Sequence, residues 1–128
     1  MDASAARSEG QRLVDDLRAL DDEAVTWTGT PSSVECGPHE TEGVEFHWAS
    51  EGAAPPDPQK FIARTYTVMR EAGFSVEQST RELHDGRPLY LVAGASDSGA
   101  QVSLGSSAVN TVLQVSSACA EGNAADYD

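Results

Sequence analysis

The chain has 128 residues, which predicts a single domain large enough for one hydrophobic core. Its 21 Asp and Glu against 8 Lys and Arg give a formal net charge of -13. This charge argues against binding to nucleic acid or to an anionic membrane surface, because phosphate groups are bound by clustered Lys and Arg. A basic or cationic partner remains compatible with it.

Residues 4–20 predict an amphipathic helix. Apolar side chains recur there at the spacing of one helix face: Leu13, Val14, Leu17 and Leu20. We expect Ser4 or Ser8 to cap its N-terminus.

Two strands are predicted next. Residues 25–30 and 34–36 form the first, with an interruption at Pro31, which lacks a backbone N–H. The second carries Val44, Phe46 and Trp48 in alternation with hydrophilic residues, so these three side chains should face the core.

A second helix is predicted to begin with Asp57 as N-cap and Pro58 at the first helical position. Gly73 suits the left-handed position that ends a helix, and Phe74 can then pack back onto it. The apolar stripe of this helix comprises Phe61, Ile62, Thr65, Val68, Met69 and Ala72.

The C-terminal half predicts four strands, at about residues 75–84, 87–94, 100–105 and 111–118, separated by turns rich in Gly, Asp and Ser. The first of them is hydrophilic on both faces and is expected to be an edge strand or a solvent-facing strand. In the last strand, strict alternation places Cys119 on the core face with Leu113 and Val115. In the strand at residues 87–94, Tyr90 and Val92 point away from the helices if Leu89 and Leu91 point toward them.

The fold class that follows is α+β, with the order helix, two strands, helix, four strands. We expect one antiparallel sheet of five to six strands with both helices packed on one face. Residues 1–128 form one domain, in which residues 1–3 and 121–128 are predicted to be disordered tails.

The two cysteines, Cys36 and Cys119, leave two interpretations open. They form one disulfide in an oxidising compartment, or they are buried free thiols in a cytosolic protein; we favour the disulfide. Residues 1–12 contain no apolar signal-peptide core. We expect a mature domain whose leader has been removed, with a cytosolic protein as the alternative.

Metal-site patterns are weak. Cys36 and His39 have the C-x-x-H spacing of half a zinc site, which Cys119 and His47 or His84 would have to complete. Since no second paired motif exists, we predict no metal ligands. The acidic loop at residues 39–42, together with Glu45, lacks the ligand pattern of a calcium loop.

The best candidate for catalysis is an acid–base pair of Glu45 and His47 on one strand face, completed by His84 or Asp85 from another strand. The sequence contains no G-x-S-x-G motif, and the Gly-rich segment at residues 94–99 precedes a strand rather than a helix. We therefore predict a non-enzyme, with no catalytic or cofactor-binding residues and no cofactor.

Several short motifs resemble the small cell-envelope lipoproteins of actinobacteria, of the LppA type. They are the leading helix, Trp27 followed by Pro31-Ser32 and Cys36, the helix start at Asp57-Pro58, and a closing segment from Gln114 to Cys119. This resemblance implies a Cys36–Cys119 disulfide, and a lipidated cysteine upstream of residue 1. It carries over no catalytic residue.

Three functions are compatible with these features. The first is an envelope or secreted lipoprotein domain, anchored outside the cytoplasmic membrane, that binds a protein or a small ligand. The second is a cytosolic acidic inhibitor of the immunity type that covers a basic partner. The third is a small enzyme that uses Glu45, His47 and His84.

Overall fold

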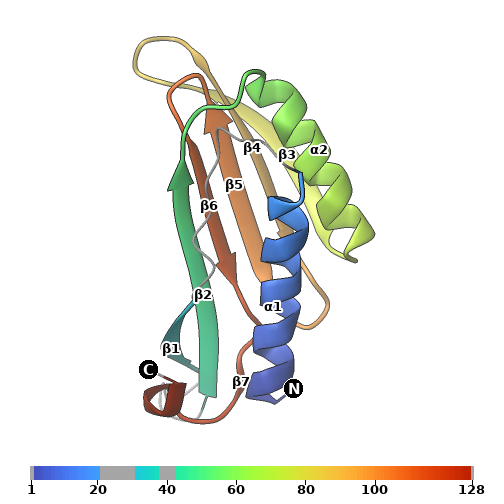
Figure 1. The fold of residues 1–128 in the computed structure, drawn as a ribbon, viewed down its shortest axis with the longest axis vertical. Coiled ribbons are helices and arrows are strands. Elements are labelled where there is room, and N and C mark those ends of the chain that lie inside the picture. The colour runs from blue at the N-terminus through green and yellow to red at the C-terminus, as the bar shows by residue number, and fades with distance from the viewer. Residues whose placement is uncertain (1, 21–30, 38–42, 128) are drawn as a thin grey trace.

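A computed structural model describes residues 2–20, 31–37 and 43–127 (Figure 1). Within these residues, two α-helices and a seven-stranded antiparallel sheet confirm the α+β class, and the sheet has more strands than the five to six expected. The elements are α1 (Ala3–Arg18), β1 (Ser32–Cys36), β2 (Gly43–Gly52), α2 (Pro58–Glu71), β3 (Ser75–Glu82), β4 (Pro88–Ala95), β5 (Gln101–Ser107), β6 (Thr111–Ser116), β7 (Ala120–Glu121) and the 3-10 helix η1 (Ala124–Tyr127). The strand expected at residues 25–30 lies outside the described residues.

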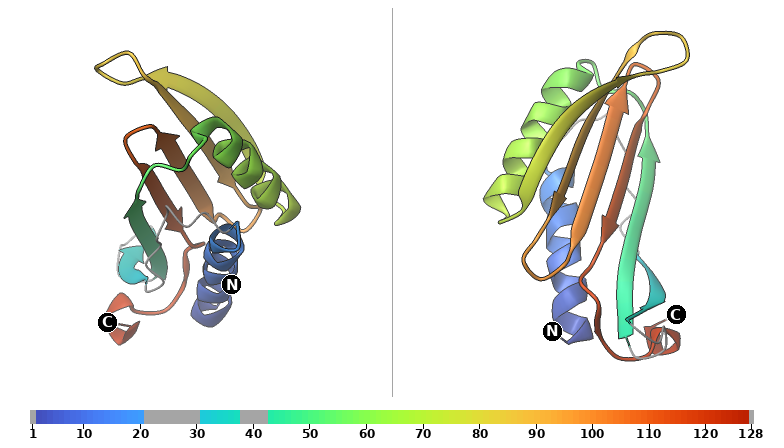
Figure 2. Two further views of the ribbon diagram at one scale, coloured as in Figure 1. Left: turned by 45° about the horizontal axis from the view of Figure 1, so that its top comes forward. Right: turned by 180° about the vertical axis from the view of Figure 1, so that it is seen from behind.

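The strand order across the sheet is β1-β2-β6-β5-β4-β3, and β7 pairs with β2 beyond the end of β6. Helix α1 packs on β2, β6 and β7, while α2 packs on β3, β4 and β5. Both helices lie on the same face, in front of the sheet in Figure 1 and behind it in the reversed view of Figure 2. Within the described residues, no helix is long and apolar enough to cross a membrane.

Helix α1 begins earlier than the sequence pattern predicts. Asp2 is the N-cap, because its carboxylate accepts a hydrogen bond from the Ala5 N–H at 2.7 Å. The expected caps, Ser4 and Ser8, instead lie inside the helix. The buried face includes small residues that a search for Leu and Val overlooks, namely Ala3, Ala6 and Gly10 in addition to Leu13, Val14 and Leu17.

The backbone of α1 lies directly against the Trp48 ring of β2 at Gly10. A Cβ added to Gly10 would meet the Trp48 ring, with Cη2 at 2.5 Å. Trp48 is 1% exposed and its indole Nε1–H donates to Oε1 of Gln11 at 3.1 Å, so the ring is held in place. A helical Gly is unfavourable by about 1 kcal/mol relative to Ala, and here its lack of a side chain makes room for the largest core residue.

We expect Gly10→Ala to lower the free energy of unfolding by about 1–2 kcal/mol. Overpacking costs about 1–3 kcal/mol, and the better helix propensity of Ala offsets up to about 1 kcal/mol of this. Urea denaturation followed by Trp fluorescence measures the change. Ser8→Ala, on the exposed side of the same helix, is the control and should change stability by less than about 0.5 kcal/mol. A stabilised Gly10→Ala variant would contradict the packing argument.

Helix α2 confirms its predicted ends. The Asp57 carboxylate accepts from the Lys60 N–H at 3.1 Å, Pro58 occupies the first turn, and Gly73 has a φ of 93°. The Phe74 N–H donates to the carbonyl of Met69 at 3.0 Å, which closes the helix C-terminus. The stripe is buried at Phe61, Ile62, Thr65 and Met69, half-buried at Val68 and exposed at Ala72.

The last long strand follows the predicted alternation until its end. Leu113, Val115 and Ser117 are buried beneath the helices. Cys119, which the same alternation places in the core, is exposed. The prediction for Cys119 is therefore wrong, and an extra residue in the strand explains why.

That extra residue forms a β-bulge between β6 and β7. From the pair His47–Ser116 to the pair Val44–Ala120, β2 advances by three residues and the opposing chain by four. One additional residue reverses the side-chain alternation and turns Cys119 outward. Ser117 satisfies the backbone at the break, because its hydroxyl oxygen accepts a hydrogen bond from a β2 N–H at 2.8 Å.

A disulfide joins Cys36 to Cys119, as expected, and it crosses the start of β2 at Gly43. Gly43 pairs with Cys36 on β1 and with Glu121 on β7. The disulfide therefore joins β1 to the residue just before β7, across the β2 strand that lies between them. A Cβ on Gly43 would lie 2.7 Å from Sγ of Cys119 and 2.8 Å from the carbonyl oxygen of Cys36. Only glycine leaves room for this crossing.

Gly43→Ala should therefore lower the free energy of unfolding by about 1–3 kcal/mol, the usual cost of overpacking. The matched control is Gly105→Ala in β5. There the nearest atoms are the ends of the Leu91 and Leu89 side chains, at 3.1 and 3.5 Å, and these can move aside. Chemical denaturation of the oxidised proteins compares the two variants. Equal stability of both would show that Gly43 is not needed for the crossing.

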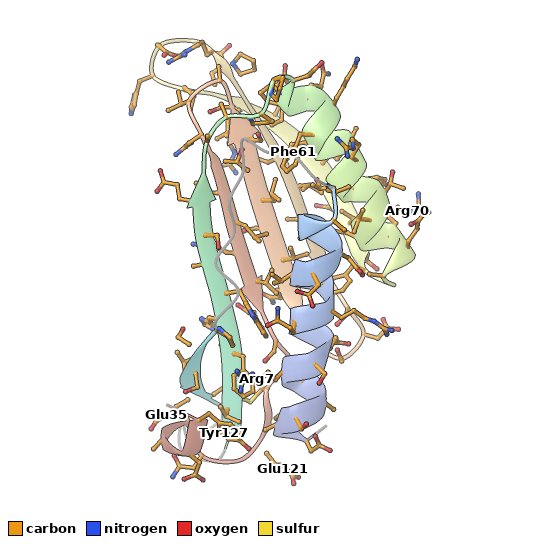
Figure 3. The ribbon with its side chains drawn as sticks, in the orientation of Figure 1. Arg7, Glu35, Phe61, Arg70, Glu121 and Tyr127 are labelled. Carbon is orange, nitrogen blue, oxygen red and sulfur yellow. A yellow bond between two sulfur atoms is a disulfide. The ribbon has the colours of Figure 1, made fainter. Side chains whose placement is uncertain are left out.

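The C-terminal segment differs from the predicted disordered tail, since Glu121 belongs to β7 and residues 124–127 form the helix η1. Ala124 is buried, and its carbonyl accepts a hydrogen bond from Oγ of Ser33 at 3.0 Å. The ring of Tyr127 packs edge-on against Phe46 with 5.4 Å between the ring centres (Figure 3). A short polar sequence gives little sign of such contacts, because they depend on a partner far away in the chain.

Candidate functional site

No described helix covers the face of the sheet opposite α1 and α2 (Figure 2). Antiparallel register places residues of neighbouring strands in rows across this face. One row runs Ser75, Ala95, Gln101, Ser116 and His47, and the next runs Glu77, Ala93, Ser103, Gln114 and Ala49. Nearly all of these side chains are small or uncharged and polar.

A shallow groove of about 600 Å³ lies over β3, β4, β5 and β6 on this face. Its floor is low because Ala93 and Ala95 carry only a methyl group. Its polar side chains include Ser103, Gln114 and Ser116, and Glu77 adds one carboxylate at the β3 side. Hydroxyl and amide groups donate and accept hydrogen bonds without charge. The groove is therefore suited to contact with a polar group or an exposed backbone.

The side chains of β4 face opposite to the arrangement considered from the sequence. Val92 is 1% exposed and packs beneath the helices with Tyr90, whereas Leu89 and Leu91 lie on the open face. Gly105 leaves space on β5 over which both leucine side chains extend. With Val112 of β6, which is 40% exposed, they form a small apolar area beside the groove.

The predicted acid–base pair is partly assembled. Glu45 and His47 share the open face of β2, and His47 Nε2 lies 2.6 Å from Oε1 of Glu45. Ser116, which lines the groove, is the register partner of His47 on β6. The pair therefore stands next to the groove, where the imidazole can exchange a proton or form a hydrogen bond with a bound group.

His84 does not join this pair. It lies in the turn between β3 and β4, and β6, β5 and β4 separate β3 from β2 in the sheet. Asp85 is held in the same turn by Arg87, whose Nε–H donates to Oδ2 of Asp85 at 2.7 Å. This hydrogen bond keeps the pKa of the Asp85 carboxyl below its usual value. The constellation of Glu45, His47 and His84 or Asp85 is therefore not brought together.

The cysteine-based metal hypothesis fails on geometry, because Cys36 and Cys119 are bonded to each other and neither can supply a thiolate. His39 and the acidic loop at residues 39–42 lie outside the described residues. Among the residues that are described, no three His, Cys, Asp or Glu side chains gather at one point.

The groove was not predicted from the sequence. Its residues come from four strands, and serine, alanine and glutamine in a strand usually signal only a solvated face. A usable sign was the concentration of small residues at Ala93 and Ala95 in a strand otherwise rich in large apolar residues.

Comparisons with known proteins show similarity only in fold. No protein-family model matches the chain, and no curated protein matches it. The structure is similar to the crystal structure of a DUF4853 family protein from Actinomyces odontolyticus, with a TM-score of 0.56. The match has 14% sequence identity and covers 95% of this chain and 67% of that chain. At this identity it shows the arrangement of helices and strands and nothing about activity.

Proposed function

We propose that this chain is a non-enzymatic binding domain of an envelope or secreted lipoprotein, and that it contacts its ligand with the open face of the sheet. The observation that carries the proposal is the division of the sheet into two unlike faces. One is closed by two helices over Trp48 and Phe46, and the other presents a groove of small polar side chains.

The disulfide supports a location outside the cytoplasm, because such bonds form and persist in oxidising compartments. The sequence resemblance to envelope lipoproteins points to the same location. The chemistry of the open face favours binding over catalysis: Glu45 and His47 form a pair next to the groove, and the third group expected to complete a catalytic site, His84, lies in a distant turn.

The oxidation state of the cysteines in the native cell tests the location. Rapid acid quenching followed by alkylation under denaturing conditions labels only free thiols. We expect no label on Cys36 or Cys119 in the cell, and two labels after chemical reduction. Two labels without reduction would place the protein in a reducing compartment and remove the lipoprotein proposal.

Photo-crosslinking tests the binding face. A photoreactive amino acid at Ser103, in the centre of the groove, should capture a specific partner in the native cell. The same amino acid at Gln59, exposed on α2, is the matched control and should capture none. Crosslinks from Gln59 alone would contradict the assignment of the open face.

The net charge of -13 favours a second candidate, an acidic inhibitor that covers a basic protein. The crosslinking experiment separates the two candidates when it is repeated at increasing salt. Charge-driven capture of a basic protein should weaken steeply as salt screens the interaction. Capture through the groove, whose described lining has a single charged residue, Glu77, should weaken much less.

A further inference from the structure

The two edges of the sheet differ in how they are protected. Edge strand β1 is short, and η1 lies against it through the hydrogen bond from Ser33 to Ala124. The opposite edge strand, β3, has eight residues, of which all but Val76 are exposed. It pairs with β4 on one side, and no described element lies beyond its other side. Its outer backbone groups can therefore pair with another strand.

The side chains of β3 alternate between the two faces of the sheet. Val76 packs against the core beneath the helices, so Gln78, Thr80 and Glu82 share the helix side. Ser75, Glu77, Ser79 and Arg81 consequently lie on the open face, as their register with the open-face residues of β4 confirms. Along the chain, the open-face side chains of β3 are therefore neutral at Ser75, negative at Glu77, neutral at Ser79 and positive at Arg81.

We propose that β3 pairs antiparallel with β3 of a second copy of this chain, about a two-fold axis at Ser79. In this register Glu77 stands directly opposite Arg81 of the partner subunit, and Arg81 opposite Glu77 of the partner subunit. Both ion pairs lie on the open face, and residues 76–82 of each copy are paired along the strand. The two sheets become one, with all four helices on the same side.

The charges favour this register over its alternatives. A two-fold axis perpendicular to the sheet keeps each residue opposite one from the same face, so the axis must pass through a residue position. Centred on Glu77, Arg81 or Glu82, the pairing sets like charges against each other. Centred on Gln78 or Thr80, it sets both open-face charges, Glu77 and Arg81, opposite uncharged side chains. Only the axis at Ser79 pairs every open-face charge of β3 with its opposite.

The same pattern argues for a second copy over an unrelated strand. A strand that is complementary to itself when reversed satisfies both ion pairs with one sequence, which is the requirement of a two-fold symmetric interface. An edge intended only to repel other strands would carry charges of one sign, whereas β3 carries both signs on one face.

Sedimentation equilibrium of the oxidised protein, extended to millimolar concentration, tests the proposal. We expect the average mass to rise from 13.5 kDa toward twice that value. Glu77→Arg places Arg against Arg twice, and Arg81→Glu places Glu against Glu twice, so each should weaken dimerisation by about tenfold or more. The combined variant E77R/R81E restores both ion pairs with exchanged positions and should recover the wild-type dimer.

Glu35→Arg on the covered edge strand β1 is the matched control, since it makes the same charge change at an exposed position. It should leave dimerisation unchanged, and thermal unfolding followed by circular dichroism confirms that every variant is folded. A wild-type protein that stays at 13.5 kDa at all concentrations overturns the proposal. So does a dimer that neither single variant weakens, or that the combined variant fails to restore.

Discussion

The crossing of the Cys36–Cys119 disulfide over Gly43 is the constraint on which the end of the sheet formed by β1, β7 and the start of β2 depends. The bond closes a loop over a sequence separation of 83 residues that contains α2 and most of the sheet. By the loop-entropy model such a link contributes roughly 4.5 kcal/mol, through the freedom it removes from the unfolded chain. It also holds β7 and the following helix η1 against β2. These two short elements make few contacts, which by themselves would offset little of the conformational entropy lost when the chain end becomes ordered.

The bulge after β6 makes this crossing possible. A regular continuation of the strand would bury Cys119 and expose its neighbours, but the extra residue turns its sulfur toward β1. At the bulge the Phe46 N–H has no backbone acceptor, and the side-chain oxygen of Ser117 accepts its hydrogen bond instead. The disulfide, the bulge and Gly43 therefore form one structural unit, in which the bond depends on both the bulge and the glycine.

The remaining architecture follows from the contrast between the two faces of the sheet. The helix side is packed to close contact, as the fit of Gly10 against Trp48 shows. The open side has been left shallow and polar by small residues in four adjacent strands. Proteins bind partners on surfaces that a rigid scaffold supports, and here the packed side provides the rigidity while the open side and the uncovered edge β3 are available for contact.

Local sequence patterns predicted the ends of the second helix, the core face of β2 and the fold class. The alternation of Val44, Phe46 and Trp48, the cap at Asp57 and Pro58, and the left-handed Gly73 depend on neighbours within a few residues, and each was predicted with its correct location. The fold class and the shared face of Glu45 and His47 also followed. The sequence favoured a Cys36–Cys119 disulfide over two free thiols, and it predicted β3 as an edge strand or a solvent-facing strand. The features that these patterns did not predict involve residues far apart in the chain. The bulge that exposes Cys119, the ordered segment at residues 121–127, the face that Leu89 and Leu91 occupy and the separation of His84 from His47 all depend on strand order and register. Both are set by packing across the sheet, to which a short stretch of sequence contributes only one side.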